Sequence, residues 1–338
     1  MRDSARGFLG ARSDSVAVRR AMESPEGYDP AVWAAAMELG WAMVAVPEEL
    51  DGIGLGYRAL ATLLFEMGRT VFCGPFLSTV GWALPTLLAS GNDEVVRRWV
   101  PELAVGAAMA TAVQLDGHAQ REGAGFRVTG AGRALDGMTA DLFLVRAGDD
   151  VFAVEAGQME RRALRTMDQT RRYASVSLDC LVPDAARLVP ACWDVGLRHA
   201  MVALAAEQAG GAGACVDMAS EYAGVRRQFG KPIGVFQAVA HKCADMFVLS
   251  TSAWTAAEAA ASALDGRTVD AHTAALVAKT YASDAYFVCA AENIQVHGGI
   301  GFTWEHDAHL HFKRARAGKG LFGEPRTHRE ALAATLLD

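Results

Sequence analysis

The stretch RRQFGKPIGVFQAVAHKCADM, from Arg226 to Met246, interrupts a helical pattern in the C-terminal half of the chain. Small or apolar residues recur at helical spacing on both sides of it: Val202, Ala206, Ala209, Ala212, Val216, Ala219 and Ala223 upstream, and Phe236, Val239, Cys243 and Met246 downstream. Gly230 favours a helix stop, while Pro232 disfavours helical angles at Lys231 and suits a helix start. The pattern therefore predicts two antiparallel helices joined at Gly230.

The predicted corner between these helices gathers two arginines, an amide and a ring: Arg226, Arg227, Gln228 and Phe229. Guanidinium groups match the geometry of phosphates, and an aromatic ring offers a flat face to a ligand. The alternative is a solvated cationic corner in which Phe229 fills the core. The corner residues alone favour neither interpretation.

Composition limits the class of protein. The chain has 338 residues, of which 51% are hydrophobic, and its formal net charge is −7. It is long enough for a large core and for two or three domains. No basic run dominates any segment, so nucleic acid is not expected as the main partner.

The six cysteines are scattered without CxxC pairs, which favours buried thiols in a reducing compartment. The N-terminus lacks the apolar core of a signal peptide, and no run of apolar residues reaches the length of a membrane span. We therefore expect a cytoplasmic protein that does not cross a membrane.

The hydrophobic periodicity changes twice along the chain. It is helical from Asp14 to about Gly106, with a stretch that begins near Asp93 and ends at Pro101. It alternates with a period of two between Met109 and Pro183, which predicts an antiparallel β domain. From Asp194 onward it is helical again, in four segments of which the last follows Arg326. The expected domains are residues 1–107 (helical), 108–190 (β) and 191–338 (four-helix bundle).

A second informative stretch, QVHGGIGF, follows the third helix of the expected bundle. The doublet Gly298-Gly299 allows a ligand to approach the backbone closely, and Gln295 places an amide one turn earlier. Alone, such a doublet is usually a helix cap and loop. Together with RRQFGKPIGVFQ and the order of domains, it resembles the acyl-CoA dehydrogenase flavoprotein family. Three further segments resemble that family: LGWAMVAVPEELDGIGLG, GNDEVVRRWVPELAVG and VSLDCLVP.

The resemblance implies a cofactor, FAD, and a set of residues that contact it. In the family, an Arg-x-x-Phe-Gly and a Gln-x-x-Gly-Gly motif of one subunit hold the ADP half of an FAD bound in the neighbouring subunit. The matching positions here, with the amide of the corner, are Arg226, Gln228, Phe229, Phe236, Gln237, Gln295, Gly298 and Gly299. An FAD shared in this way implies at least a dimer.

The catalytic base that the family needs is missing from both of its usual positions. The family removes an α-proton from an acyl-CoA thioester with a glutamate, and an ungapped count places that glutamate at Phe322, or at Ala200 in members that carry it on the first bundle helix. Glu324 is a weak candidate that a shifted loop would present. Glu207 lies about two turns beyond Ala200, roughly 10 Å along the helix axis, and is interpreted as structural.

The β domain also departs from the family pattern. An acid expected after Thr111 is replaced by Ala112, and the segment Ala134 to Leu142 has lost its aromatic residue. The chain thus keeps residues that reach a partner's flavin and weakens those that hold its own. It resembles the β-type subunit of the α2β2 enzymes that actinobacteria use on bulky, steroid-type CoA thioesters.

Three functions stay open from the sequence: a subunit of such a heteromer whose homologous partner supplies the base, a self-sufficient enzyme that uses Glu324, and a scaffold without catalysis. The resemblance implies an acyl-CoA substrate and an electron-transfer flavoprotein as acceptor, but not which acyl group. His306, His309 and His311 lie close together in the sequence, and metal-ligand pairs often lie one helical turn apart, as His306 and His309 would in a helix. No cysteine pair or supporting partner accompanies these histidines, so no metal is expected.

Overall fold

Contacts divide the chain into two units, each described here by itself. The computed structural model describes residues 1–266 and 270–337. The bundle unit comprises Met1–Arg19, Tyr57–Phe72 and Met201–Asp338, and the sheet unit comprises Arg20–Gly56 and Cys73–Ala200. The three domains expected with boundaries after residues 107 and 190 are not tested by this division and stay a prediction.

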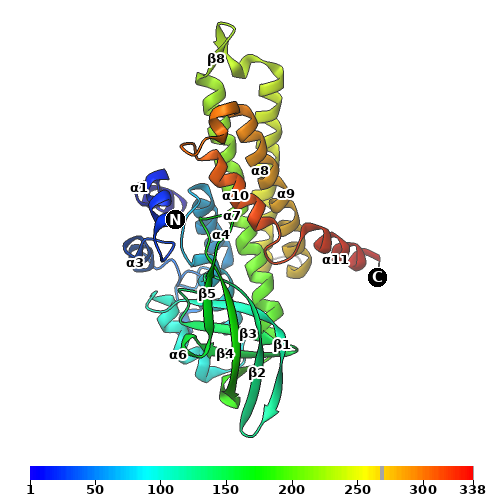
Figure 1. Ribbon diagram of the computed structural model, residues 1–338. Coiled ribbons are helices and arrows are strands. Elements are labelled where there is room, and N and C mark those ends of the chain that lie inside the picture. The colour runs from blue at the N-terminus through cyan, green and yellow to red at the C-terminus, as the bar shows by residue number, and fades with distance from the viewer. Residues whose placement is uncertain (267–269, 338) are drawn as a thin grey trace. The chain divides into compact units, whose positions relative to one another are not determined.

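Long helices form the bundle unit. They are α1 (Arg2–Arg12), α4 (Tyr57–Arg69), most of α7 (Ala191–Val225), α8 (Gln237–Leu264), α9 (Ala271–His297), α10 (Ala308–Lys319) and α11 (Pro325–Leu337), with α2 (Ser15–Glu23) beginning here and the 3-10 turn η6 (Gly298–Phe302) after α9. Helix α9 packs against α8, α10 and α11. Figure 1 shows the hairpin strand β8 at the tip where α7 leads into α8.

Two glycines let α4 and α7 approach each other closely. A Cβ added at Gly68 would lie 1.8 Å from the carbonyl oxygen of Glu207, and one added at Gly210 would lie 1.8 Å from that of Phe65. Only glycine leaves room for such an approach of backbone to backbone. One glycine from each helix thus brings α4 and α7 together.

The corner between α7 and α8 is longer than the sequence predicts. Residues Arg227–Gln228 (β8) and Lys231–Pro232 (β9) form a two-stranded hairpin, the turn η5 (Ile233–Val235) follows, and α8 begins at Gln237. The expected end of the first helix at Gly230 and the expected start of the second at Pro232 are therefore both wrong, since α7 already ends at Val225. The reason is that Phe229 and Gly230 both adopt left-handed φ angles, 51° and 79°, which suit a two-residue hairpin turn.

The expected count of four C-terminal helices is also too low, because α10 lies between α9 and α11. Its sequence, AHLHFKRARAGK, lacks a clear apolar stripe. Three of its buried residues are the polar His309, His311 and Arg314, so its inward face does not stand out as hydrophobic.

The sheet unit combines short helices with a seven-stranded sheet. The helices are α3 (Pro30–Glu38), η1 (Glu48–Leu50), the π-helix η2 (Leu77–Ala83), α5 (Leu84–Leu88) and α6 (Asp93–Ala104). The strand order is β5-β6-β2-β1-β3-β4-β7, with β1 (Ala110–Glu122), β2 (Gly125–Leu135), β3 (Leu142–Ala147), β4 (Asp150–Glu155), β5 (Glu160–Leu164), β6 (Tyr173–Pro183) and β7 (Arg187–Leu188). Short turns η3 (Ala156–Gln158) and η4 (Asp184–Ala186) connect them.

The expected order of helices, sheet and helices is confirmed, with two differences in detail. Strands β1 and β3 pair in parallel, while the other pairs of the seven-stranded sheet are antiparallel. Helix α6 continues past Pro101 to Ala104. Pro101 is exposed, so its missing N–H costs one hydrogen bond near the helix end without a clash in the core.

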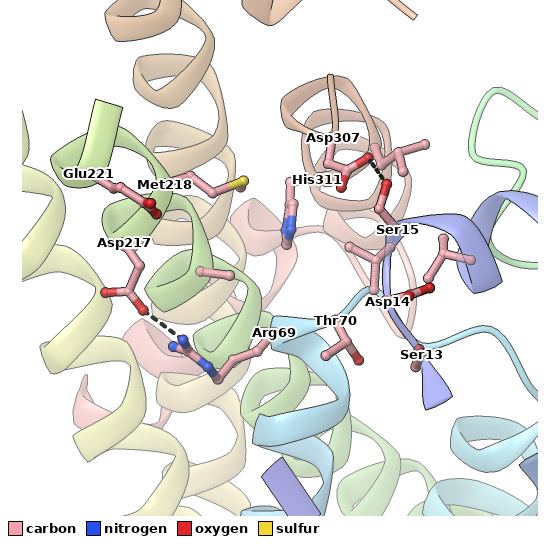
Figure 2. Close-up of a pocket in the computed structure, with 14 residues that line it drawn as sticks. Ser13, Asp14, Ser15, Arg69, Thr70, Asp217, Met218, Glu221, Asp307 and His311 are labelled. Carbon is pink, nitrogen blue, oxygen red and sulfur yellow. Dashed lines mark hydrogen bonds and ion pairs between the residues drawn. The ribbon is translucent and has the colours of Figure 1, made fainter. Parts of the chain in front are cut away.

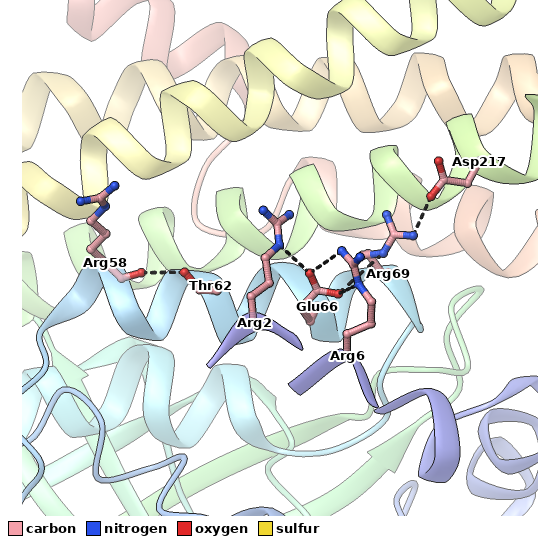
Figure 3. A network of polar contacts seen from close by, with 7 residues as sticks. All are labelled: Arg2, Arg6, Arg58, Thr62, Glu66, Arg69 and Asp217. Carbon is pink, nitrogen blue, oxygen red and sulfur yellow. Dashed lines mark hydrogen bonds and ion pairs between the residues drawn. The ribbon is translucent and has the colours of Figure 1, made fainter. Parts of the chain in front are cut away.

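Within the bundle unit, a buried carboxylate of α4 holds the N-terminal helix α1 in place (Figure 3). Glu66 of α4 is 1% exposed and accepts hydrogen bonds from Arg2 at 2.8 Å and from Arg6 at 3.0 Å. Arg69, 3.7 Å from Glu66, also pairs with Asp217 of α7 at 2.6 Å. Burial alone would raise the pKa of Glu66, but the hydrogen bonds from Arg6 and Arg2 outweigh it, and the pKa is lowered.

We expect Glu66→Gln to lower the free energy of unfolding by about 2 kcal/mol at pH 7, because it removes a buried charge from half-exposed arginines. The pKa of Glu66 is lower in the folded chain, so its contribution is present above the unfolded pKa and is lost as the pH falls. The difference between the two proteins should therefore shrink below about pH 4.5. Urea unfolding of the original chain and of Glu66→Gln, at pH 7 and below about pH 4.5, measures this difference. The exposed Glu330→Gln is the control.

Candidate functional site

The corner between α7 and α8 projects into solvent. Residues 226–230 are all exposed, and the Phe229 side chain is 90% exposed. The alternative in which Phe229 fills the core is therefore wrong. The ring of Phe229 meets that of Phe236 edge to face at 6.0 Å, and Lys231 Nζ lies 4.9 Å from the centre of the Phe236 ring. The corner is a preformed aromatic and cationic surface.

The second candidate segment is an open backbone turn at the end of α9. Gln295, Gly298 and Gly299 are exposed, and Gly298 has a left-handed φ of 63°. A Cβ added at either glycine would meet no atom within 4 Å. The bare backbone is therefore accessible to a ligand or a partner, and Gly298 takes an angle that other residues rarely adopt.

A stack of rings links the two segments. Tyr222, one turn before Arg226, stacks on His297 with ring centres 4.4 Å apart, and His297 lies 4.3 Å from the ring of His306. His297 Nδ1 is also 2.8 Å from the carbonyl oxygen of Asn293. Sequence reasoning missed Tyr222 and His297. The only sequence signal for them was their position next to the two motifs. Tyr222 lies four residues before Arg226, and His297 lies between Gln295 and Gly298.

Neither expected base position offers a carboxylate. Ala200 is buried on α7, in the sheet unit. Phe322 lies in the turn between α10 and α11 with a φ of 60°. Glu324, in the same turn, is exposed. Glu207 is paired with Arg314 at 2.9 Å, and Arg314 also donates to the Phe72 carbonyl at 2.8 Å, so this acid joins α7, α10 and the end of α4.

At the first departure from the family pattern, Thr111 and Ala112 are both buried, whereas the segment from Ala134 to Leu142 also contains the exposed Met138. The Thr111 hydroxyl donates to the Leu135 carbonyl at 2.7 Å, and Ala112 is 1% exposed and pairs with Leu144 across the parallel strands. Both side chains thus serve the packing of the sheet unit.

The three clustered histidines have separate surroundings. His306 Nδ1 accepts from the backbone N–H of Ala308, His309 stacks on Trp304 at 4.8 Å, and His311 Nδ1 lies 2.9 Å from the Tyr286 hydroxyl. Burial lowers the pKa of His311 to about 4. Among residues 1–266 and 270–337, no three His, Cys, Asp or Glu side chains are grouped to hold a metal ion.

A cavity of about 270 Å³ lies in the bundle unit, and His311 and Asp307 are part of its lining. Figure 2 shows its polar lining, where Asp217 pairs with Arg69 and Ser15 donates to Asp307. None of the expected FAD-contact residues lines it. Within the described part of the chain, no helix has both the length and the apolar content needed to span a bilayer.

Comparisons with known proteins agree over the whole chain. Residues 1–107 match the acyl-CoA dehydrogenase N-terminal domain, and residues 194–337 match the acyl-CoA dehydrogenase C-terminal domain. The chain is 35% identical over 334 residues to acyl-CoA dehydrogenase IpdE2 of Mycobacterium tuberculosis, covering 96% of this chain and 93% of that protein. It is 34% identical to IpdE2 of Mycolicibacterium smegmatis over 99% of this chain and 97% of that one.

Two solved structures of similar shape are protein complexes or parts of them. The ChsE4-ChsE5 complex of Mycobacterium tuberculosis matches with a TM-score of 0.93 and 25% identity, over 100% of this chain and 96% of that one. The Tcur3481-Tcur3483 steroid ACAD G363A variant matches with a TM-score of 0.91 and 26% identity, over 99% and 96%.

We expect Phe229→Ala to leave the free energy of unfolding of the isolated chain within about 0.5 kcal/mol of the original value, because the ring is exposed. Phe65→Ala, which truncates a buried ring of α4 in the same unit, should cost about 3 kcal/mol. Urea unfolding of both variants makes the comparison. A large loss at Phe229 would mean that the ring supports the fold and is not kept for a ligand or partner.

Proposed function

Because the chain belongs to the acyl-CoA dehydrogenase family, whose members are FAD-dependent oxidoreductases, we propose that it is one subunit of a heteromeric acyl-CoA dehydrogenase. A homologous partner chain supplies the catalytic base and most of the flavin site. The observation that carries this proposal is that both expected base positions, Ala200 and Phe322, lack a carboxylate while both flavin-contact motifs are kept.

The surface at the bundle tip fits the ADP half of a partner's FAD. The Arg226 guanidinium is exposed and has no ion pair or side-chain hydrogen bond among the described residues, so it is available to a pyrophosphate. Phe229 offers a ring face, and the backbone at Gly298 and Gly299 is open to close approach. The amides of Gln228, Gln237 and Gln295 supply exposed donors and acceptors around them.

The reaction divides its requirements between the two chains. FAD, when bound, accepts the hydride that leaves the β-carbon of the acyl-CoA. The α-proton needs a carboxylate within hydrogen-bond reach, and the partner chain provides it. This chain contributes Arg226, Phe229 and the Gly298 turn, which orient the ADP half of FAD and exclude water from it. Neither Ala200 nor Phe322 of this chain carries a carboxylate.

The similar complexes support a paired assembly and a bulky substrate. ChsE4-ChsE5 is a two-component complex, and the Tcur3481-Tcur3483 protein is described as a steroid ACAD. We infer by analogy an α2β2 heterotetramer that acts on a bulky, steroid-type acyl-CoA. An electron-transfer flavoprotein would reoxidise the flavin.

The test is to purify the chain alone and together with a co-expressed homologous partner, and to record flavin content and reduction by a steroid-type acyl-CoA. We expect a colourless chain alone and a yellow, reducible pair with one FAD per two unlike chains. One FAD per chain and activity without a partner would overturn the heteromer. A pair that never binds flavin would leave only the scaffold function.

Within the pair, Arg226→Gln should weaken FAD binding by at least tenfold, because a charge-assisted contact to the pyrophosphate is lost. Arg227→Gln is the matched control, since its guanidinium donates to the Gly230 carbonyl inside the hairpin at 3.3 Å. Flavin release during dilution measures both. Equal effects of the two substitutions would argue for general electrostatics and against the specific contact.

Glu324→Gln should leave the turnover of the pair within about twofold of the original, because the partner holds the base. A loss of two orders of magnitude or more, the size expected for a general base, would instead assign that role to Glu324. Steady-state kinetics with the same acyl-CoA decides between them.

A further inference from the structure

Lys279 of α9 is a fully buried lysine with all three of its N–H donors in use. Its side chain is 0% exposed. Nζ donates to Ser283 Oγ at 2.9 Å, to the Lys319 carbonyl at 3.0 Å and to the Gly323 carbonyl at 3.2 Å. A buried lysine is costly unless it is paired, so an arrangement that satisfies it completely holds its partners in place.

Two of these acceptors are the ends of one turn. Lys319 is the last residue of α10, and Gly323 closes the turn of residues 320–324 before α11 begins at Pro325. The turn is strained, with φ angles of 60° at Phe322 and 105° at Gly323. Lys279 therefore bridges the carbonyl end of α10 and the far side of a strained turn, where a cation also favours the negative end of the helix dipole.

Other contacts hold the same turn from the remaining sides. A Cβ added at Gly323 would lie 2.6 Å from Cε1 of His328, a buried residue of α11, so the turn packs directly against that ring. Behind Lys279, Ser283 Oγ donates to Gln208 Oε1 of α7 at 2.9 Å. The turn is thus connected through Lys279 and Ser283 to the centre of the bundle.

Glu324 is folded back over its own turn. A Cβ added at Gly320 would lie 2.6 Å from Glu324 Oε1. For its carboxylate to take the position of Phe322, the chain would have to slip by two residues and break the hydrogen bond between Lys279 and Gly323. The network that satisfies Lys279 opposes that shift.

We propose that Lys279 is a positioning residue: it clamps the turn of residues 320–324, holds Phe322 in place and keeps Glu324 from taking its position. The clamp itself is a property of this chain. Its consequence for the substrate rests on the proposed function, so the two are tested separately.

The clamp is tested on the chain alone by chymotrypsin cleavage after Phe322. Lys279→Met keeps the aliphatic stem but removes every donor, and cleavage at this bond should rise by at least tenfold. Lys319→Met is the matched control, since it removes a neighbouring lysine whose side chain pairs with Asp284 at the surface, at 2.8 Å, and leaves the clamp intact. Circular dichroism at the same temperature verifies that both variants are folded. Unchanged cleavage in folded Lys279→Met overturns the clamp.

A pH profile separates the clamp from simple packing. Burial lowers the pKa of Lys279 to about 8, against the opposing effects of Glu324 and Asp284 and together with repulsion from Lys319. His328, the other titratable group against the turn, has a pKa lowered by burial and is neutral in this range. Opening the turn hydrates Lys279 and returns its pKa toward about 10.5.

The open state therefore binds more protons than the closed state above about pH 8, so raising the pH favours the closed turn. Each cleavage rate is divided by the rate on an unstructured peptide of the same sequence, which removes the pH dependence of chymotrypsin itself. Between pH 7.5 and 9, the ratio of this normalised rate in the original chain to that in Lys279→Met should fall. A ratio that does not change with pH would contradict control of the turn by this ammonium group.

The consequence for the reaction is measured on the flavin-loaded pair. Because the base and most of the flavin site belong to the partner chain, Lys279→Met and Lys319→Met should both leave the KM for the acyl-CoA and the flavin content of the pair within about twofold of the original. A rise in KM of fivefold or more in Lys279→Met alone would place this turn at the substrate and contradict the assignment of the reacting site to the partner. A pair without flavin would refute the proposed function, and the cleavage result would stand independently of it.

Discussion

The stacking of Tyr222 on His297 is the contact on which the candidate site depends. The residues that would meet a cofactor are exposed and make few contacts of their own, so their position has to be fixed from behind. Tyr222 lies at the end of α7 and His297 at the end of α9, and their rings are 4.4 Å apart. This contact connects the helix that leads to Arg226 with the helix that leads to Gly298, close to the ends of both. Together with the hydrophobic cluster against which Tyr222 packs, it gives an exposed surface a defined geometry.

Local patterns predicted the elements better than the connections between them. The alternation in β6 identifies a strand with one buried face, but a period of two carries no information about the direction of its neighbours, so the parallel pairing of β1 with β3 could not be predicted. A corner near Gly230 was predicted, but as a helix stop: α7 ends at Val225, and Gly230 takes its left-handed angle in the turn of the hairpin instead. That Phe229 takes one as well, and so opens a hairpin before α8, is uncommon for an aromatic residue.

The candidate site also contains some residues that the sequence indicates and others that only the packed structure reveals. Arg226, Phe229 and the Gly298 doublet were selected because their motifs resemble those of the family, whereas the chemistry of guanidinium, ring and bare backbone alone left their role open. Tyr222, His297 and Lys279 could not be selected, because their roles come from partners on other helices. Lys279 lies 44 residues from Gly323, and no local periodicity distinguishes it from an ordinary lysine of a helix. Contacts of that kind become visible only when the helices are packed.

The buried acids of the described residues give a physical reason for the missing base. Glu66 is held by arginines, Glu207 by Arg314, Asp136 by the Ser78 hydroxyl and Asp168 by Thr170. A general base in a dehydrogenase needs a carboxylate that faces the substrate and is free to accept a proton. Acids that already accept strong hydrogen bonds hold their charge for structure, as the lowered pKa of Glu66 illustrates. The buried acids among the described residues are thus committed to holding helices and turns in place, which agrees with the proposed assignment of the base to a partner chain.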